Sequence, residues 1–351
     1  KARSWDAIRP PMGDLERAVD SWKAHTRTMD GADIADRARA QALAMLANGT
    51  TAVRTHVDIL TTGDPLRGVH ALVGVREELA GLMDIELVAL AGPDALDADI
   101  EGALDAGVDA VGGAPHLAPD PLADLHRLLA IAERRGAPVD LHTDESLEGP
   151  DTLLALARAV RGWPQNVSAG HCVRLGMMTD AELAPVVAEV VASRVGVIAN
   201  PITNLYLQGW QHPVGTPRGL TALRGLIDSG ARVAAGADNV RDPFNPLGRG
   251  DALETAMLLV VAGHLTIDEA YHLVSGGARD VMALPPAGPV PGAAAELLAV
   301  RAGGLAEAVA SAPADRVVIH AGRVVAWSEL TQRIAPPGSP TAATPILEAA
   351  R

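Results

Sequence analysis

The sequence predicts an α/β fold of the (β/α)8 TIM-barrel type with a small β domain beside it. Short apolar runs rich in β-branched residues recur along the chain, and longer segments with helical spacing separate them. Strands that alternate with helices in this way form a parallel sheet. Polar side chains also collect where the apolar runs end, and in a parallel barrel these ends share one face.

Seven strands are expected from the apolar, β-branched runs. In chain order they cover residues 51–59, 85–92, 109–116, 138–145, 166–172, 194–201 and 231–238. A closed barrel of this type has eight strands. The chain opens with what resembles the loop and helix that follow a first strand, so we expect that strand to precede Lys1.

Helices are expected between these strands. Helical spacing of apolar residues covers 14–48, 68–83, 94–106, 120–135, 150–160, 217–229 and 252–263. Capping-box patterns begin two further helices, at Thr179 to Glu182 and at Thr266 to Glu269. The helix at 252–263 is a candidate surface for self-association into a homo-oligomer.

The chain changes character after residue 284. A Pro/Gly linker at 285–292 is followed by strand-like runs at 296–301 and 316–326, the second folding back as a hairpin at Ala321-Gly322. These strands are too few to form a stable sheet alone. They are expected to complete a small β domain whose other strands precede Lys1. The predicted domains are a barrel at 1–284, a small β domain at 285–336 and a tail at 337–351.

Composition narrows the class of partner. The formal net charge of -14 disfavours nucleic acid and anionic membranes, which leaves a small molecule as the expected partner. No apolar stretch approaches the roughly 20 residues that span a bilayer. Cys172 is the single cysteine, so an intrachain disulfide is excluded and a reducing, cytoplasmic location is expected.

Eight polar residues are expected to converge at the strand ends, namely His56, Asp58, His116, His142, Glu145, His171, Asn204 and Asp238. Among them, His142 is followed three residues later by Glu145, and such a pair suits metal binding by the histidine and proton transfer by the carboxylate. A purely structural role stays open for His56 and His116. An unpaired carboxylate at Asp238 would be costly to bury, which favours a metal or another cationic partner. Cys172 is expected to be a buried apolar residue rather than a nucleophile.

Four motifs carry a family resemblance. These are Val53-Arg-Thr-His-Val-Asp58, Leu141-His-Thr-Asp-Glu145, Ala199-Asn-Pro201 with Leu207-Gln-Gly209, and the run from Gly236-Ala-Asp-Asn to Pro246-Leu-Gly248. In this order along nearly the whole chain they resemble the amidohydrolase superfamily, in particular bacterial cytosine deaminases and the N-substituted s-triazine (isopropylammelide-type) aminohydrolases.

The resemblance implies roles for individual residues. His142 and Asp238 would be metal ligands, and Asp238 would also accept a proton. Glu145 would pass a proton to a ring nitrogen, and His171 would orient the nucleophile. His56 and Asp58 would support these groups from behind. The implied cofactor is one divalent transition metal, Zn2+ or Fe2+, with Mn2+ also suitable for such ligands.

The chain also departs from the family pattern. The His-x-His pair of the family's first strand is absent, because the sequence starts where that motif would just have ended. Gly92, Asn239 and Phe244 stand at substrate-binding positions where cytosine deaminase has glutamine, aspartate and tryptophan. Such changes alter the hydrogen bonds offered to a substrate ring, so cytosine itself is not the expected substrate.

The expected function is metal-dependent hydrolysis of a C-N bond in a small N-heterocycle, which makes the protein a hydrolase of the deaminase or aminohydrolase type. One alternative is a cyclic amidase or N-acyl amidohydrolase. A second alternative, from a different class, is a non-catalytic ligand-binding barrel, which would apply if the His-x-His pair is truly absent.

Overall fold

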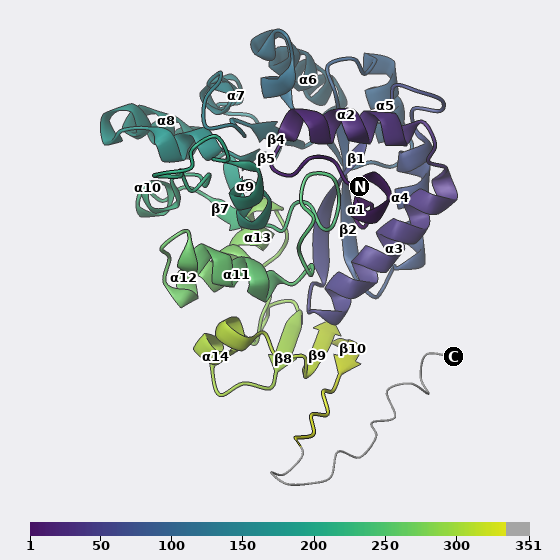
Figure 1. The fold of residues 1–351 in the computed structure, drawn as a ribbon, viewed down its shortest axis with the longest axis vertical. Coiled ribbons are helices and arrows are strands. Elements are labelled where there is room, and N and C mark those ends of the chain that lie inside the picture. Colours follow the sequence, from purple (N-terminus) through teal and green to yellow (C-terminus); the bar gives the residue numbers. More distant parts are fainter. Residues whose placement is uncertain (335–351) are drawn as a thin grey trace.

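The structure, a computed structural model, describes residues 1–334 and contains a parallel sheet of seven strands in the order β1 to β7 (Figure 1). The strands are β1 (Ala52–Asp58), β2 (Asp84–Ala91), β3 (Ala110–Gly113), β4 (Val139–Thr143), β5 (Val167–His171), β6 (Gly196–Ala199) and β7 (Val233–Ala235). Each strand pairs with its neighbour in sequence, which is the topology of a barrel wall. Six lie within the expected segments, and β2 begins one residue before its segment, at Asp84.

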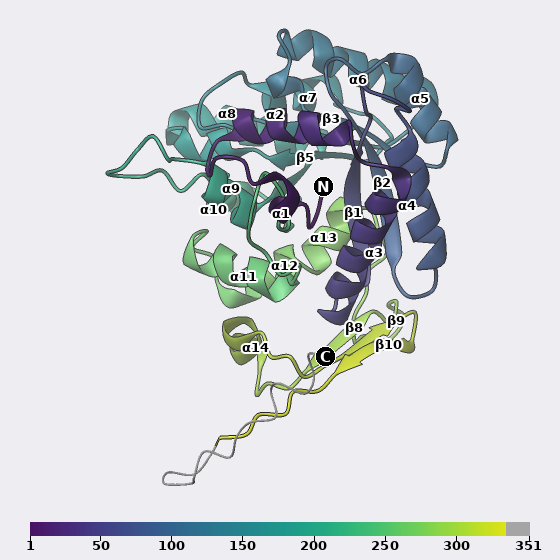
Figure 2. The ribbon, with the colours of Figure 1, turned by 45° about the vertical axis from the view of Figure 1, so that its right-hand side comes forward.

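The sheet curls, with β1 and β7 as its two edges, and within residues 1–334 these edges do not pair with each other. Helices pack around the outside of the curl (Figure 2). The α/β barrel class predicted from the sequence is thus confirmed, with seven strands described.

Most expected helices form, with shorter bounds than the sequence patterns suggest. The helices between strands are α4 (Arg67–Glu78), α5 (Asp97–Asp105), α6 (Pro121–Arg135), α7 (Thr152–Ala159), α8 (Asp180–Ser193), α9 (Pro201–Leu207) and α10 (Leu223–Asp228). After β7 come α11 (Ala252–Val261), α12 (Ile267–Leu273) and α13 (Gly276–Val281). Of these, α9 and α13 were not expected. Both predicted capping boxes are present, at the starts of α8 and α12.

The segment 14–48 is not one helical stretch. It divides into α2 (Leu15–Thr26) and α3 (Gly31–Ala47), after a short α1 (Trp5–Ile8). The Asp30 side chain accepts a hydrogen bond from the Asp33 amide and caps α3, and a cap of this kind marks a helix start that apolar spacing alone does not reveal.

Helix α2 lies across the strand ends in both views of the ribbon (Figures 1 and 2). Its buried Ala18 and Trp22 form an apolar cluster with Met29, Leu207 and Phe244. Since Leu207 belongs to α9 and Phe244 to the segment after β7, this cluster covers the face where the polar strand ends are expected.

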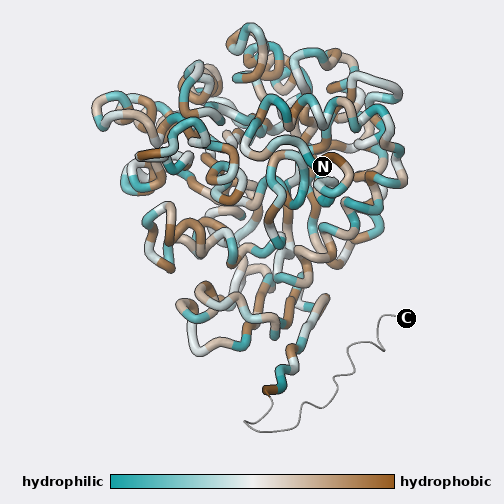
Figure 3. The backbone as a smooth tube through the Cα atoms, in the orientation of Figure 1, coloured by the Kyte–Doolittle hydropathy of each residue, from teal (hydrophilic) through white to brown (hydrophobic). Residues whose placement is uncertain are grey.

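The core consists of aliphatic side chains, as the low aromatic content requires. The main cluster contains mostly Leu, Val and Ala from the strands and the inner faces of the helices. Hydrophilic and hydrophobic residues both occur along the outer helices (Figure 3), which suits helices with one face on a core. No helix within residues 1–334 has the length and apolarity to cross a membrane.

A second, antiparallel sheet lies below the barrel in Figure 1. It contains β8 (Leu297–Val300), β9 (Arg316–His320) and β10 (Arg323–Ser328), with α14 (Leu305–Ser311) between the first two strands. The small β unit and its hairpin were expected, whereas α14 was not. The exact domain boundaries stay predictions, and the predicted tail at 337–351 falls outside the described residues.

Candidate active site

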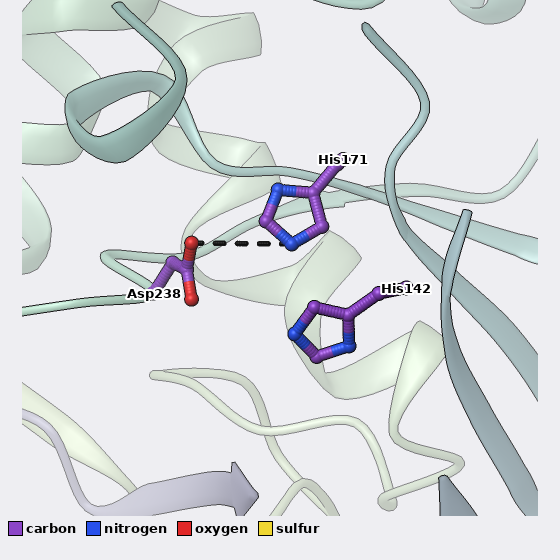
Figure 4. Close-up of side chains that lie close together, drawn as sticks. All are labelled: His142, His171 and Asp238. Atoms are coloured by element: carbon purple, nitrogen blue, oxygen red, sulfur yellow. Dashed lines mark ion pairs between the residues drawn. The ribbon is translucent and has the colours of Figure 1, made fainter. Parts of the chain in front are cut away.

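Three potential metal ligands meet where strands β4, β5 and β7 end. The ligand atoms of His142, His171 and Asp238 all lie within 4.8 Å of one another. His171 Nε2 is 3.9 Å from Asp238 Oδ2, and the three side chains point toward a common space (Figure 4). The prediction that these strand ends converge is confirmed for this group.

Strand alternation explains why these groups face inward. Side chains two apart on a strand share a face, so Asp140 and His142 both point into the barrel from β4, as Arg54 and His56 do from β1. The His56 and His142 rings lie edge to face with centroids 4.8 Å apart, and the His142 and His171 centroids are also 4.8 Å apart. The His142 ring therefore packs between the rings of His56 and His171.

The backbone is strained where the site side chains leave their strands. Asp144, His171, Cys172 and Asp238 all have positive φ, between 46° and 69°. This conformation is strained for non-glycine residues, and they keep it where the surrounding structure requires a particular side-chain direction. Four of the non-glycine residues with positive φ thus lie at the strand ends that carry the ligand atoms.

A buried charged layer lies one step deeper in the barrel. Arg54 donates to Glu86, to Asp140 at 2.7 Å and to Ser168 at 2.8 Å. Asp140 Oδ1 lies 3.2 Å from His56 Nε2. Burial alone would raise the pKa of Asp140, but His56, Arg54 and Ser168 outweigh it and hold that pKa well below its usual range. The carboxylate therefore stays charged and anchors His56 under His142.

The local electrostatics suit a cation at the three-residue group. Burial, with the neighbouring His56 and His171, keeps the pKa of His142 well below its usual value, so its imidazole is neutral as a metal ligand must be. Its Nδ1 is buried and has no hydrogen-bond partner within the described residues. Burial raises the pKa of Asp238 to about 7, with Glu145 adding to the effect. A divalent cation would satisfy both groups, so the residues present fit a metal.

Glu145 lies beside this group and is nearly enclosed. Its Oε2 is 3.3 Å from His116 Nε2 and its Oε1 is 3.7 Å from His171 Nδ1, while its side chain is 7% exposed. Burial alone would raise the pKa of Glu145, but His171 and His116 outweigh it and hold that pKa far below its usual range. A carboxylate held between two imidazoles can exchange protons with the space above the histidines.

Two polar contacts fix the loop that carries Glu145. Asp144 accepts hydrogen bonds from the Thr152 amide at 2.8 Å and the Thr152 hydroxyl at 2.6 Å. Gln208 donates to the Glu145 carbonyl oxygen at 2.7 Å. The loop is thereby tied both to the start of α7 and to the residue that follows α9.

Asn204 holds the other side of His171. This residue of α9 lies 3.0 Å from His171 Nδ1 through its side-chain nitrogen. His171 is 1% exposed, so the contact restricts both the rotation of the ring and the placement of its proton.

The residues predicted to bind substrate surround the site less closely. Gly92 directly follows β2, and a Cβ added there would meet no atom within 4 Å, so the space beside it is open. Asn239 donates to Asp242 at 2.7 Å. Phe244 is 9% exposed and belongs to the apolar cluster under α2. A cavity of about 160 Å3 borders Asp238 and Asn239, which leaves room next to the site. Their substrate contacts remain predictions.

Two other expectations concern Asp58 and Cys172. Asp58 forms an ion pair with Lys1 at 3.0 Å rather than contacting the three-residue group, so its supporting role stays a prediction. Cys172 is fully buried, and burial strongly raises the pKa of its thiol. It is a packed apolar residue, as expected.

Sequence reasoning missed the supporting polar residues, notably Asp140, Asp144 and Gln208. One signal was present for Asp140, because a charged residue two positions before His142 within an apolar strand must face the same interior. Asp144 and Gln208 lie within the quoted motifs, but their roles were not predicted, since their partners lie elsewhere along the chain.

Imidazole and carboxylate groups at the carboxyl ends of a parallel barrel are typical of hydrolases that use a divalent ion, and this is the class that the fold and the site define. The amidohydrolase family profile matches residues 3–326. The chain belongs to this family.

Similar proteins agree with this assignment. A pterin deaminase of Rhizobium rhizogenes is 30% identical over 93% of this chain and 77% of its own length. The structure of 5-methylcytosine deaminase from Klebsiella pneumoniae with 5-fluorocytosine has a TM-score of 0.83 and 27% identity, covering 93% of this chain and 82% of the other. That of N-isopropylammelide isopropylaminohydrolase from Burkholderia multivorans has a TM-score of 0.74 and 31% identity, covering 87% and 78%.

These findings confirm the resemblance stated from the sequence motifs. They also confirm, at the level of the family, that the chain is a hydrolase of carbon-nitrogen bonds.

Proposed function

We propose that this protein hydrolyses the bond between a ring carbon and an exocyclic amine in a small N-heterocycle, releasing ammonia or an amine. The observation that carries the proposal is the placement of Glu145 within contact distance of His171, which itself faces Asp238. A proton carrier, a ring that can orient a water and a carboxylate acceptor thus surround one space, as an addition and elimination at a ring carbon requires.

His142 and Asp238 would hold the divalent ion, and His171, whose ring nitrogen lies within 4.8 Å of both ligand atoms, would orient the attacking water. When bound, such an ion lowers the pKa of a water from 15.7 to roughly 7 and so makes it a nucleophile at neutral pH. Zinc or iron is the first candidate and manganese the second, since neutral imidazole and carboxylate ligands suit all three.

The protein's own groups move the protons. His171, held by Asn204, orients the attacking water toward the ring carbon. As the new C-O bond forms, Glu145 takes one proton from this water and passes it to the adjacent ring nitrogen, so that Glu145 ends as the carboxylate it was at the start. Asp238 then accepts the proton of the new hydroxyl group and passes it to the amine nitrogen. The C-N bond breaks, neutral ammonia or amine leaves, and the ring carbon becomes a carbonyl.

A pterin is the first substrate to test. A Cβ added at Gly92, a predicted substrate-binding position, would meet no atom within 4 Å outside Gly92 and its chain neighbours, so no side chain fills that position against a larger ring. The relative that matches 93% of this chain at 30% identity is a pterin deaminase. Both points favour a bicyclic substrate over cytosine.

The test is ammonia release by the metal-loaded protein from a panel of pterins, pyrimidines, aminotriazines and creatinine-like rings. Release from at least one ring, lost in the E145Q variant, is the expected result. A ring-opened product without ammonia would indicate a cyclic amidase instead. If no compound of the panel releases ammonia or opens its ring while ligand binding is retained, the non-catalytic binding barrel would be favoured.

Two further properties stay proposals. A cytoplasmic location accords with the single, buried cysteine, and cell fractionation would test it. A homo-oligomer formed through α11 would be tested by light scattering on the purified chain.

A further inference from the structure

We propose that His116 is a positioning residue that holds the Glu145 carboxylate in the orientation needed for proton transfer. The inference rests on the proposed function, because it concerns the residue proposed to carry the proton. Sequence patterns left the role of His116 open between structure and function, and its contacts in the fold decide the question.

The chain brings His116 to the site through a tight turn after β3. Gly112 and Gly113 end this strand, and a Cβ on Gly112 would lie 2.9 Å from the Asp140 carbonyl oxygen on β4. Pro115 then begins a short 3-10 turn, Pro115–Leu117. This close approach of β3 to β4 directs the His116 ring at the end of β4, where His142 and Glu145 lie.

Both ring nitrogens of His116 face groups of the site. Nδ1 lies 3.2 Å from the His142 carbonyl oxygen, and Nε2 lies 3.3 Å from Glu145 Oε2. The side chain is 4% exposed. Within the described residues Nε2 has no well-aligned hydrogen-bond partner, and the Glu145 carboxylate is the polar group that it faces.

The contact of Nδ1 with the His142 carbonyl oxygen limits how Nε2 can interact with Glu145. A carbonyl oxygen only accepts hydrogen bonds, so Nδ1 carries a hydrogen. If Nε2 were bare, its lone pair would face a carboxylate oxygen in a buried site, which is repulsive. One hydrogen shared between Nε2 and Oε2 removes this repulsion, whichever of the two groups carries it, and the 3.3 Å contact then holds the Glu145 carboxyl group in place.

The carboxylate is thereby held at both ends. His116 contacts Oε2, while His171 lies 3.7 Å from Oε1. A proton carrier fixed in this way needs no reorientation before transfer, and small misplacements of such groups cost large factors in rate. Without His116, the Glu145 side chain would lose one of its two orienting contacts.

Two variants separate positioning from packing. In H116N the amide nitrogen replaces Nδ1 and keeps the contact with the His142 carbonyl, but the side chain is too short to reach Glu145. In H116Q the longer amide replaces Nε2 and keeps the contact with Glu145. If His116 only packs, both variants should lose activity to a similar degree.

The expected result is a kcat about 10–100-fold lower in H116N, the range typical for a residue that orients a functional group, with KM changed less than kcat. H116Q should recover most of the lost kcat. The control is H126N, at an exposed histidine of α6, which should match the wild type. Equal kcat values in wild type and H116N, or equal losses in both variants, would overturn the proposal.

Crystal structures of the variants make the test independent of the proposed function. The Glu145 carboxylate should rotate away in H116N and keep its place in H116Q. An unmoved carboxylate in H116N would overturn the positioning role even if no substrate has been found. If the wild type is inactive on every ring while the carboxylate moves as expected, the proposed function fails and the role of His116 stands.

Discussion

At the scale of single residues, the site depends on side chains that are buried and still polar. Glu145, His171 and Asp140 are each less than 10% exposed, and each has at least one polar contact that offsets its desolvation. A substitution at such a position removes a specific polar interaction rather than general packing. Its effect on the catalytic rate can therefore be measured separately from its effect on the stability of the fold.

The substitution Glu145→Gln should leave metal binding intact and lower kcat by about 10²–10⁴-fold, the usual contribution of a general acid or base. Glutamine keeps the shape of the side chain but cannot carry the proton. Elemental analysis and steady-state kinetics on the same sample would measure both effects. E148Q, in the exposed part of the same loop, is the matched control, and full activity in E145Q would remove Glu145 from proton transfer.

Cys172 should resist alkylation in the native protein. Its thiol is fully buried beside Thr143, and burial raises its pKa, so thiolate is scarce at neutral pH. Treatment with iodoacetamide at pH 7.5, followed by mass spectrometry, should show no adduct until denaturant is added. Rapid labelling of the folded protein would contradict the described environment.

At the scale of elements, a buried ion pair joins the barrel to the small sheet. Arg316 of β9 donates to both oxygens of Asp251, at 3.0 and 2.6 Å, and also to the Asn48 carbonyl oxygen at 2.6 Å. Asp251 caps α11, and Asn48 is the last cap residue of α3. One guanidinium therefore ties two barrel helices to β9.

The substitution Asp251→Asn should lower the free energy of unfolding by about 3–5 kcal/mol, because it leaves the Arg316 charge buried without its partner. Asparagine is a good helix cap, so the loss would come from the ion pair and not from α11. Urea denaturation would measure it. R301M, which removes the exposed pair with Asp315, should cost about 0–1 kcal/mol; equal losses would refute the distinction.

At the scale of the whole molecule, the site is assembled from three strands that are distant in sequence. His142, His171 and Asp238 come together because β4, β5 and β7 run parallel and end at one face. A cation bound between His142 of β4 and Asp238 after β7 would link separate parts of the sheet, so metal binding and folding should be coupled.

Purified protein should contain close to one transition metal per chain, and its removal by a chelator should lower the melting temperature and abolish turnover. At a free metal concentration of 100 times Kd, the expected stabilisation is about 2.7 kcal/mol. Inductively coupled plasma analysis and calorimetry would measure these. H142N should lose the metal, and H126N should keep it. A metal content near zero after reconstitution would contradict the site.

Much of the architecture was predictable because it follows from local rules. The seven strands were visible as apolar runs, and the capping boxes at Thr179 and Thr266 predicted the starts of α8 and α12. The division of 14–48 into two helices was not predicted, since apolar spacing continues across the break. His116 and Glu145 were both expected at the strand-end face, but the contact between His116 Nε2 and Glu145 Oε2 was not predictable, because it depends on how closely β3 packs against β4.

The sequence by itself determined the barrel class, the family resemblance and the strand-end residues His142, His171 and Asp238, because strand periodicity and motif order are local properties of the chain. Only the tertiary structure decided that Asp140 anchors His56, that Asn204 holds His171 and that His116 faces Glu145. These contacts join residues on different elements, and their distances depend on how the strands curl and pack rather than on spacing along the chain.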